Sequence, residues 1–280
     1  MRKKITLLIC TELLLACSIA APPQADVKLT VFDCGYLHFD DVSAFSLTND
    51  ETPVRELFVP CYLIEHQDGR LLWDAGLPIG IAGEDPVEFA PGATMRYAVS
   101  LTDQLARQNL KPEDIDLVAF SHMHFDHVGA ANLFSHAKLL IQQAEYQAAF
   151  VDKNDRLYDP TTPALYLELA DSEREMLRGD YDVFGDGSVL IVSAPGHTPG
   201  HQVLLVHLSN FGPLVLSGDL YHFRKSRELR RAPQFNSDAQ QTLASMDKVE
   251  ALIGSAGATL WIEHDKALAD TLRKAPAFYD

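Results

Sequence analysis

Basic residues are scarce in this sequence of 280 residues. Lys and Arg number 23 against 39 Asp and Glu, so the formal net charge is -16 at pH 7. A chain of that charge repels phosphate backbones and anionic lipid surfaces, which argues against nucleic acid as a partner. After the first residues, no apolar run approaches the ~20 residues that cross a bilayer. No repeat of about 20–50 residues indicates a solenoid or a propeller.

The first 20 residues have the pattern of a secretory signal peptide. Three basic residues at positions 2–4 precede an apolar stretch, and small residues and two prolines follow it. We therefore expect residues 1–20 to be a signal peptide and residues 21–280 to form one domain. Cleavage after Ala20 would give a soluble periplasmic protein, whereas the residues that end at Cys17 also resemble a lipoprotein box and would place a lipid there.

Cysteine is also rare, with four residues in the chain, of which Cys34 and Cys61 lie beyond the predicted signal peptide. Both fall in apolar segments that read as strands. Export would permit a disulfide between them. The sequence does not show that their Cα atoms approach within about 7 Å, so two buried thiols are the favoured expectation.

The order of predicted elements indicates an α/β protein with a mixed sheet. Runs rich in β-branched and aromatic residues predict strands at 27–34, 57–65, 70–73, 116–120, 138–141, 188–193, 202–207, 214–216 and 259–262. Helical patterns cover 98–110, 128–134, 142–150, 171–178, 237–252 with Ser237 as N-cap, and 266–272. The stretches 36–56 and 75–94 read as long loops that cover a site. Groups of strands separated by helices favour packed α/β layers.

One short segment carries the clearest chemistry. It places His122, His124, Asp126 and His127 directly after a predicted strand. In extended chain, residues i and i+2 face the same way, so His122 and His124 can reach one metal ion together. Once the chain turns, Asp126 and His127 can face a second position about 3.5–4 Å away. Imidazole and carboxylate donors suit Zn²⁺ first, with Fe, Mn or Co as alternatives.

Two ions need further ligands, and three candidates follow later strands. His197 lies in a Gly- and Pro-bounded loop after residues 188–193 and is placed to complete the first position. Asp219 follows residues 214–216 and offers a carboxylate that could bridge both ions. His264 follows the last predicted strand and could complete the second position. The sequence therefore predicts a centre with two divalent metal ions.

This set of motifs resembles the metallo-β-lactamase superfamily over essentially the whole chain beyond the signal peptide. The resemblance implies a four-layer αβ/βα sandwich with a dinuclear metal site at one sheet edge. It implies that His122, His124 and His197 bind one metal, that Asp126, His127 and His264 bind the other, and that Asp219 bridges them. Asp74, in the segment Trp73-Asp74-Ala75-Gly76, would orient the ligand loop, and His201 would have a supporting role.

Such a site implies hydrolysis by a hydroxide that bridges two cations, because metal binding lowers the pKa of water to about 7. Asp126 would hold or pass the proton as the substrate opens. The alternative is a metal-dependent binding protein that kept the ligands and lost turnover. Because all seven candidate ligands are present, the sequence favours a metal-dependent hydrolase, with zinc as the expected ion.

Flanking segments are similar to the N-acyl homoserine lactonase branch of this superfamily. They are residues 31–35, 59–66 and 261–265. The resemblance implies a small-molecule lactone or ester as substrate, with phosphotriesters as the runner-up. Many lactonases of this branch carry a Tyr three residues after the bridging Asp, where this sequence has His222, with Tyr221 one position earlier. Either side chain could donate to a substrate oxygen.

Two further groups of residues bear on substrate binding. Aromatic and apolar residues in the covering loops could line an acyl pocket or pack the loops down; they are Phe39, Phe45, Phe89, Met95, Tyr97 and Phe223. Residues 224–231 are strongly basic. A solvated loop is the favoured interpretation of this run, and an electropositive rim that attracts an anionic substrate is the alternative.

Overall fold

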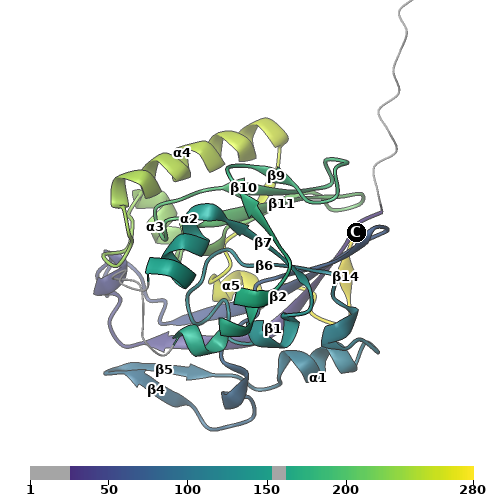
Figure 1. The fold of residues 1–280 in the computed structure, drawn as a ribbon. Helices are drawn as coiled ribbons and strands as arrows, with labels where there is room; N and C mark the ends of the chain where they lie inside the picture. The colour runs from purple at the N-terminus through teal and green to yellow at the C-terminus, as the bar shows by residue number, and fades with distance from the viewer. Residues whose placement is uncertain (1–25, 153–161) are drawn as a thin grey trace, which may run out of the picture.

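Two β-sheets packed against each other form the centre of the molecule (Figure 1). The computed structural model describes residues 26–152 and 162–280. The predicted signal peptide and the candidate lipid site at Cys17 lie outside these ranges.

The first sheet has nine strands within the described ranges, in the order β4-β5-β1-β2-β3-β6-β7-β8 with β14 paired to β1. The pairs β3–β6, β6–β7 and β7–β8 are parallel, and the other pairs are antiparallel. The bounds are β1 Lys28–Phe39, β2 Glu56–His66, β3 Gly69–Trp73, β4 Val87–Ala90, β5 Ala93–Arg96, β6 Leu117–Ala119, β7 Lys138–Gln142, β8 Arg174–Leu177 and β14 Phe278–Tyr279.

The second sheet has five strands within the described ranges, in the order β13-β12-β11-β10-β9. The β12–β13 pair is parallel and the other pairs are antiparallel. The bounds are β9 Tyr181–Asp182, β10 Val189–Ser193, β11 Gln202–Leu208, β12 Gly212–Leu216 and β13 Thr259–Trp261.

Helices cover the outer faces of both sheets. In Figure 1, α4 lies beside β9–β11 at one side of the molecule and α1 lies at the opposite side. The α-helices are α1 Leu101–Ala106, α2 Gln143–Tyr146, α3 Arg224–Leu229, α4 Ala239–Ala256 and α5 Lys266–Ala269, and a π-helix follows α2 over Gln147–Asp152. Short 3-10 helices span Ser43–Phe45, Ile79–Ile81, Pro112–Asp114, Ala131–Phe134, Thr162–Leu165, Leu167–Asp171 and Gly218–Leu220. None of the helices in the described ranges is long and apolar enough to cross a membrane.

The alternation of side chains along each strand divides the core into separate layers. In β2, Val59 and Leu63 belong to the cluster under α1, whereas Tyr62 and Ile64 belong to the cluster between the two sheets. A third cluster joins the second sheet to α4. Three apolar clusters between helix, sheet, sheet and helix confirm the predicted four-layer αβ/βα sandwich.

Several local predictions were wrong. Residues 171–178 do not form a helix, because β8 pairs with the parallel strand β7 and sends Leu177 into the core. The predicted loops 36–56 and 75–94 contain the end of β1, the strand β4 and the start of β5. Ser237 is not the N-cap of α4. Its hydroxyl donates to the backbone carbonyls of Gly196 and His197, and Asp238 caps the helix by accepting from the Gln241 amide.

The expectation of two free thiols was also wrong. Cys34 on β1 and Cys61 on β2 form a disulfide, with their Cα atoms 5.9 Å apart. The bridge lies beneath the turn after β3, since a Cβ atom at Gly76 would approach the Cys34 Cβ to 2.3 Å. The backbone N–H of Ala75 in the same turn donates to the His127 carbonyl at 2.7 Å. The disulfide therefore supports a turn that contacts the predicted metal segment.

Candidate metal centre

The predicted ligands come together because each one follows a strand that ends at the same edge of the two sheets. Parallel strands place their carboxyl ends on one side, so the loops that leave them meet there. Four strand ends contribute: β6 leads to His122, β10 to His197, β12 to Asp219 and β13 to His264.

We call the first donor group the set His122 Nε2, His124 Nδ1, His197 Nε2 and Asp219 Oδ2. The His124 nitrogen lies 2.8 Å from that of His122 and 3.1 Å from that of His197. Asp219 Oδ2 lies 3.2 Å from His197 Nε2. Donors on a tetrahedral zinc ion with Zn–N bonds of about 2.0–2.1 Å are about 3.3 Å apart, so this spacing fits a metal ion.

The second donor group consists of Asp126 Oδ2, His127 Nε2, His264 Nε2 and Asp219 Oδ1. Asp219 Oδ1 lies 2.8 Å from His264 Nε2 and 3.2 Å from His127 Nε2. Asp126 Oδ2 is 3.7 Å from each of these two nitrogens. The two oxygens of Asp219 thus face different donor groups, as a bridging carboxylate requires.

The opposite nitrogen of three imidazoles has a fixed partner. His127 Nδ1–H donates to Asp74 at 2.8 Å, His264 Nδ1–H to the Phe58 carbonyl at 2.7 Å, and His197 Nδ1–H to Asn236 Oδ1 at 2.9 Å. With Nδ1 protonated, each Nε2 presents a lone pair to the centre. His127 Nε2 and Asp219 Oδ1 are buried and make no hydrogen bond among the described residues, which is the arrangement that a cation would satisfy.

The pKa shifts of the imidazoles also fit a metal site. Burial, reinforced by neighbouring imidazoles, holds the pKa of His122 well below its usual value. Despite burial, the Asp219 carboxylate raises the pKa of His264 to about 9 and that of His127 well above normal. The Asp219 carboxylate thus favours positive charge beside both rings, and a bound cation would supply it.

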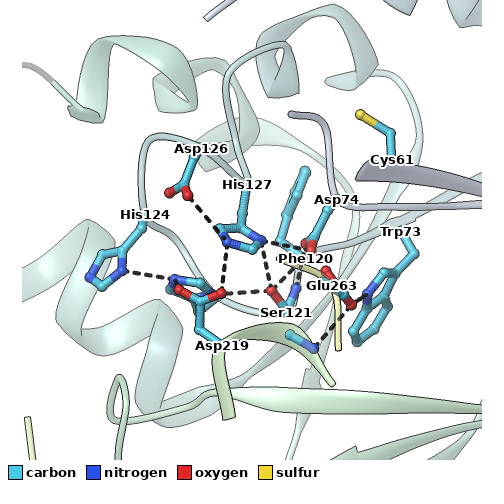
Figure 2. Close-up of polar contacts among 12 residues, drawn as sticks. Cys61, Trp73, Asp74, Phe120, Ser121, His124, Asp126, His127, Asp219 and Glu263 are labelled. Carbon is cyan, nitrogen blue, oxygen red and sulfur yellow. Dashed lines mark hydrogen bonds and ion pairs between the residues drawn. The ribbon is translucent and has the colours of Figure 1, made fainter. Parts of the chain in front are cut away.

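Residues behind the donors hold them in place (Figure 2). Asp74 accepts from the Ser121 amide at 2.6 Å as well as from His127. His201 lies outside both donor groups, as expected, and its Nε2 accepts from the Asp219 amide at 2.9 Å. Gly218 has φ +48, and a Cβ there would lie 2.7 Å from both the His201 ring and Ser121, so glycine is required for this approach.

Sequence reasoning missed several supporting residues. Asn236 orients His197, and Ser121 links Asp74 to the His122 and His127 rings at 3.1 Å each. Glu263 is buried beside Asp74 and His127, where it accepts from Trp73 Nε1 and the Gly218 amide. Burial and the neighbouring Asp74 raise the pKa of Glu263 to about 8. No role was predicted for these residues, although Glu263 lies in the segment 261–265 and directly precedes a predicted ligand.

Residues 54–253 match the family described as the Metallo-beta-lactamase superfamily. The chain belongs to the metallo-β-lactamase superfamily. The seven residues predicted as ligands are the ones that the fold gathers into two donor groups around Asp219.

Similar members of the superfamily include proteins named as lactonases. The N-acyl homoserine lactonase AttM of Rhizobium johnstonii is 30% identical over 266 residues, which is 91% of this chain and 100% of the relative. An N-acyl homoserine lactonase of a Bacillus species is 28% identical over 79% of this chain and 87% of its own length. A solved N-acyl homoserine lactone hydrolase with bound N-hexanoyl-L-homoserine superimposes with a TM-score of 0.75 at 24% identity, covering 91% of this chain and 99% of the other.

A cavity of about 510 Å³ opens onto the two donor groups. His124, Asp126, Asp219 and His264 line it on one side. Its apolar walls are Leu37, Phe39, Phe45, Leu57, Phe89, Phe125 and Phe235. Phe39, Phe45 and Phe89 thus line the cavity, in keeping with the first of the two interpretations given for them. Met95, Tyr97 and Phe223 are not among the lining residues, and Phe125 and Phe235 were missed.

The structure separates the two residues considered for substrate contact. His222 lines the cavity, and its Nε2 lies 2.9 Å from Asp219 Oδ2. The rings of Phe45 and Phe235 lie 5.0 and 5.7 Å from its ring. Tyr221 does not reach the cavity. Its hydroxyl donates to Glu250 at 2.8 Å and its ring packs in the cluster under α4.

The basic run 224–231 forms the helix α3 and the turn after it, so the expectation of a solvated loop was wrong. It does not present free positive charge either. Each of its five basic side chains pairs with a carboxylate; the pairs are Arg224–Asp265, Lys225–Glu228, Arg227–Glu250, Arg230–Asp247 and Arg231–Glu51. The structure therefore gives no support to an electropositive rim.

Proposed function

We propose that this protein is a lactonase that opens the ring of N-acyl homoserine lactones with two divalent metal ions, zinc first among them. Such a reaction ends signalling by these molecules, which is quorum quenching. The relatives named above support the substrate class, and the shared Asp219 between two donor groups supports two ions.

The observation that carries the proposal is the contrast between the two parts of the cavity. Phe39, Phe89 and Phe235 belong to an apolar wall, and the donor groups lie at its other side. No Lys or Arg is among the lining residues in the described part of the chain. A neutral substrate with an apolar tail and a polar reactive end fits this division, because apolar walls bind by burial and polar groups fix orientation. An acyl homoserine lactone has both parts.

Bound divalent ions would supply polarisation of the lactone carbonyl and would lower the pKa of water to about 7. The residues that would hold them are the two donor groups. Ring opening adds water to the carbonyl carbon, breaks the bond to the ring oxygen and leaves one proton to be moved to that oxygen. Asp126 lies at the cavity with its Oδ2 facing His127 and His264, so its carboxylate is placed to take up that proton and deliver it.

His222 contributes at the same place. Its Nε2 lies 2.9 Å from Asp219 Oδ2, and its ring stacks at 24° on that of His264. Its Nδ1 is buried without a hydrogen-bond partner in the described ranges. We assign His222 two tasks, which are to orient Asp219 and to form the polar surface on which the lactone head rests.

The test is to purify the protein, quantify its metals and assay three substrates side by side. These are N-dodecanoyl homoserine lactone, paraoxon and a chromogenic β-lactam. Two metal ions per chain with dominant lactone turnover would support the proposal. Two ions with dominant paraoxon turnover would move the substrate to phosphotriesters. A metal-loaded chain that is inactive on all three would overturn the lactonase assignment and favour a binding role.

We also propose that the protein is exported to the periplasm by the signal at residues 1–20. The disulfide between Cys34 and Cys61 supports this, because such bonds persist in oxidising compartments. Fractionation of producing cells, followed by mass measurement of the mature N-terminus, is the test. A chain that starts at Ala21 in the periplasm supports simple cleavage. A lipid on Cys17 supports anchoring, and an uncut cytoplasmic chain overturns both.

A further inference from the structure

A buried carboxylate lies behind the first donor group and takes no part in it. Glu145, in the short helix α2, is 4% exposed. Its Oε1 accepts from the Met123 amide at 2.9 Å and its Oε2 accepts from the Gly200 amide at 2.8 Å. Each oxygen therefore has its own backbone partner.

The two amides belong to the two loops that supply the first donor group. Met123 stands between His122 and His124, and Gly200 is three residues after His197. The second loop also packs closely on α2, since a Cβ at Gly200 would lie 2.4 Å from the Glu145 nitrogen. One side chain thus joins the His122 and His124 loop to the His197 loop from behind.

The charge of this residue needs an explanation. Within the described ranges, Glu145 forms no ion pair with a Lys, Arg or His side chain. A buried carboxylate without a cation is costly, and burial accordingly raises the pKa of Glu145. A neutral acceptor such as a Gln side chain or a carbonyl would suffice for a backbone amide, so the Met123 and Gly200 amides do not by themselves explain a charged group. A carboxylate at this place is favourable when positive charge is bound in the loops that it joins.

We propose that Glu145 is a positioning residue, whose carboxylate fixes the spacing between the His122 and His124 loop and the His197 loop and so sets the affinity of the first donor group for its metal ion. The inference rests on the metal ions of the proposed function and not on the identity of the substrate. The second donor group has no hydrogen bond to Glu145 and should be independent of it.

The experiment compares wild type with Glu145→Gln and Glu145→Asp. Gln keeps the size but can accept at one oxygen only, and Asp keeps the charge but is too short to hold both amides. Glu250→Gln is the matched control, because Glu250 accepts from Tyr221 and Arg227 and touches neither ligand loop. Zn²⁺ affinity is measured by chelator competition, and the Co²⁺-loaded protein is followed by its visible absorption.

We expect both Glu145 variants to lose about 10- to 100-fold in affinity at one of two metal positions, with the other unchanged. The metal-induced rise in Tm should shrink in the same variants and persist in the control. Equal affinities in wild type and both variants would overturn the proposal, as would a uniform fall at both positions that tracks a lower Tm. Wild type that binds no metal would instead overturn the proposed function. If Glu145→Gln fails to fold, Glu145→Asp alone decides.

Discussion

Asp74 and His127 are joined by a 2.8 Å hydrogen bond between buried atoms that lie 53 residues apart in the chain. The bond fixes the Nδ1–H tautomer of His127, so that Nε2 faces Asp219 and the second donor group. Asp74 directly follows β3 and also accepts from the Ser121 amide, so it connects the imidazole ring of His127 to the first sheet (Figure 2). Partners of this kind raise the basicity of a ligand and restrict its orientation.

Replacement of Asp74 by Asn should therefore weaken metal binding at the second donor group by about 10- to 100-fold. An Asn side chain has one acceptor oxygen in place of two, so it cannot accept from both His127 and the Ser121 amide. Metal stoichiometry after dialysis against a weak chelator measures the effect. Asp182→Asn is a suitable control, because Asp182 accepts two backbone amides in a turn at the edge of the second sheet. Full retention of two ions in Asp74→Asn would contradict this role.

Replacement of Asp126 by Asn should reduce hydrolysis by about 10²- to 10⁴-fold, since a positioned proton-transfer group contributes about that much. Asp126 is largely buried but is a loop residue that faces the cavity, so the fold should persist. The rate is compared on protein whose metal content is measured in the same sample. Undiminished turnover at equal metal content would show that another group moves the proton.

Much of this site was predictable from the sequence because its ligands follow strands. The strand-end rule placed His197, Asp219 and His264 together although 67 residues separate the first from the last by their numbers. The hairpin of β2 and β3 and the helix α4 were also predictable from turn residues and apolar periodicity. These features depend on short stretches of chain that carry their own signal.

The rest depended on tertiary contacts. Residues 174–177 have no strand signal of their own and become β8 because β7 offers a free edge. The Cys34–Cys61 bridge depends on the register of β1 against β2, in which Phe32 pairs with Cys61. Asn236 bonds to His197, and Glu145 bonds to the loop of His122 and His124, in each case across a long stretch of sequence, so no local motif could mark them.

Loss of the disulfide should destabilise the fold. Replacing Cys34 and Cys61 together by Ser opens a loop closed over 27 residues, which costs about 3.5 kcal/mol. Urea unfolding of wild type and variant gives the difference. Wild type treated with a reductant in the unfolded state serves as the control, and its stability should fall to that of the variant. Equal stability of all three samples would mean that the bond contributes nothing.

The outer aromatic wall of the cavity should favour long acyl chains. Phe235 is 37% exposed, so Phe235→Ala should spare the fold while removing apolar contact for the end of the chain. We expect KM for N-dodecanoyl homoserine lactone to rise about five- to tenfold, from roughly 1 kcal/mol of lost burial, and KM for the butanoyl compound to change little. Phe211→Ala removes an equally exposed ring that packs on Trp261 and is the control. Equal changes in KM for both substrates would show that the acyl chain binds elsewhere.

His222 offers the sharpest test of how the polar end of the cavity selects its substrate. Its Nε2 lies 2.9 Å from Asp219 Oδ2, at the position where the family resemblance leads us to expect a Tyr. Tyr at this position could donate its hydroxyl to a substrate oxygen, whereas Phe fills the space without a donor. We expect His222→Tyr to retain lactone turnover within about tenfold of wild type and His222→Phe to lose a further tenfold, as for one lost hydrogen bond to a charged group. Steady-state kinetics on a lactone and on paraoxon, at equal metal content, measure both variants. Identical kinetics in wild type, Tyr and Phe variants would show that this side chain neither orients Asp219 nor contacts the substrate.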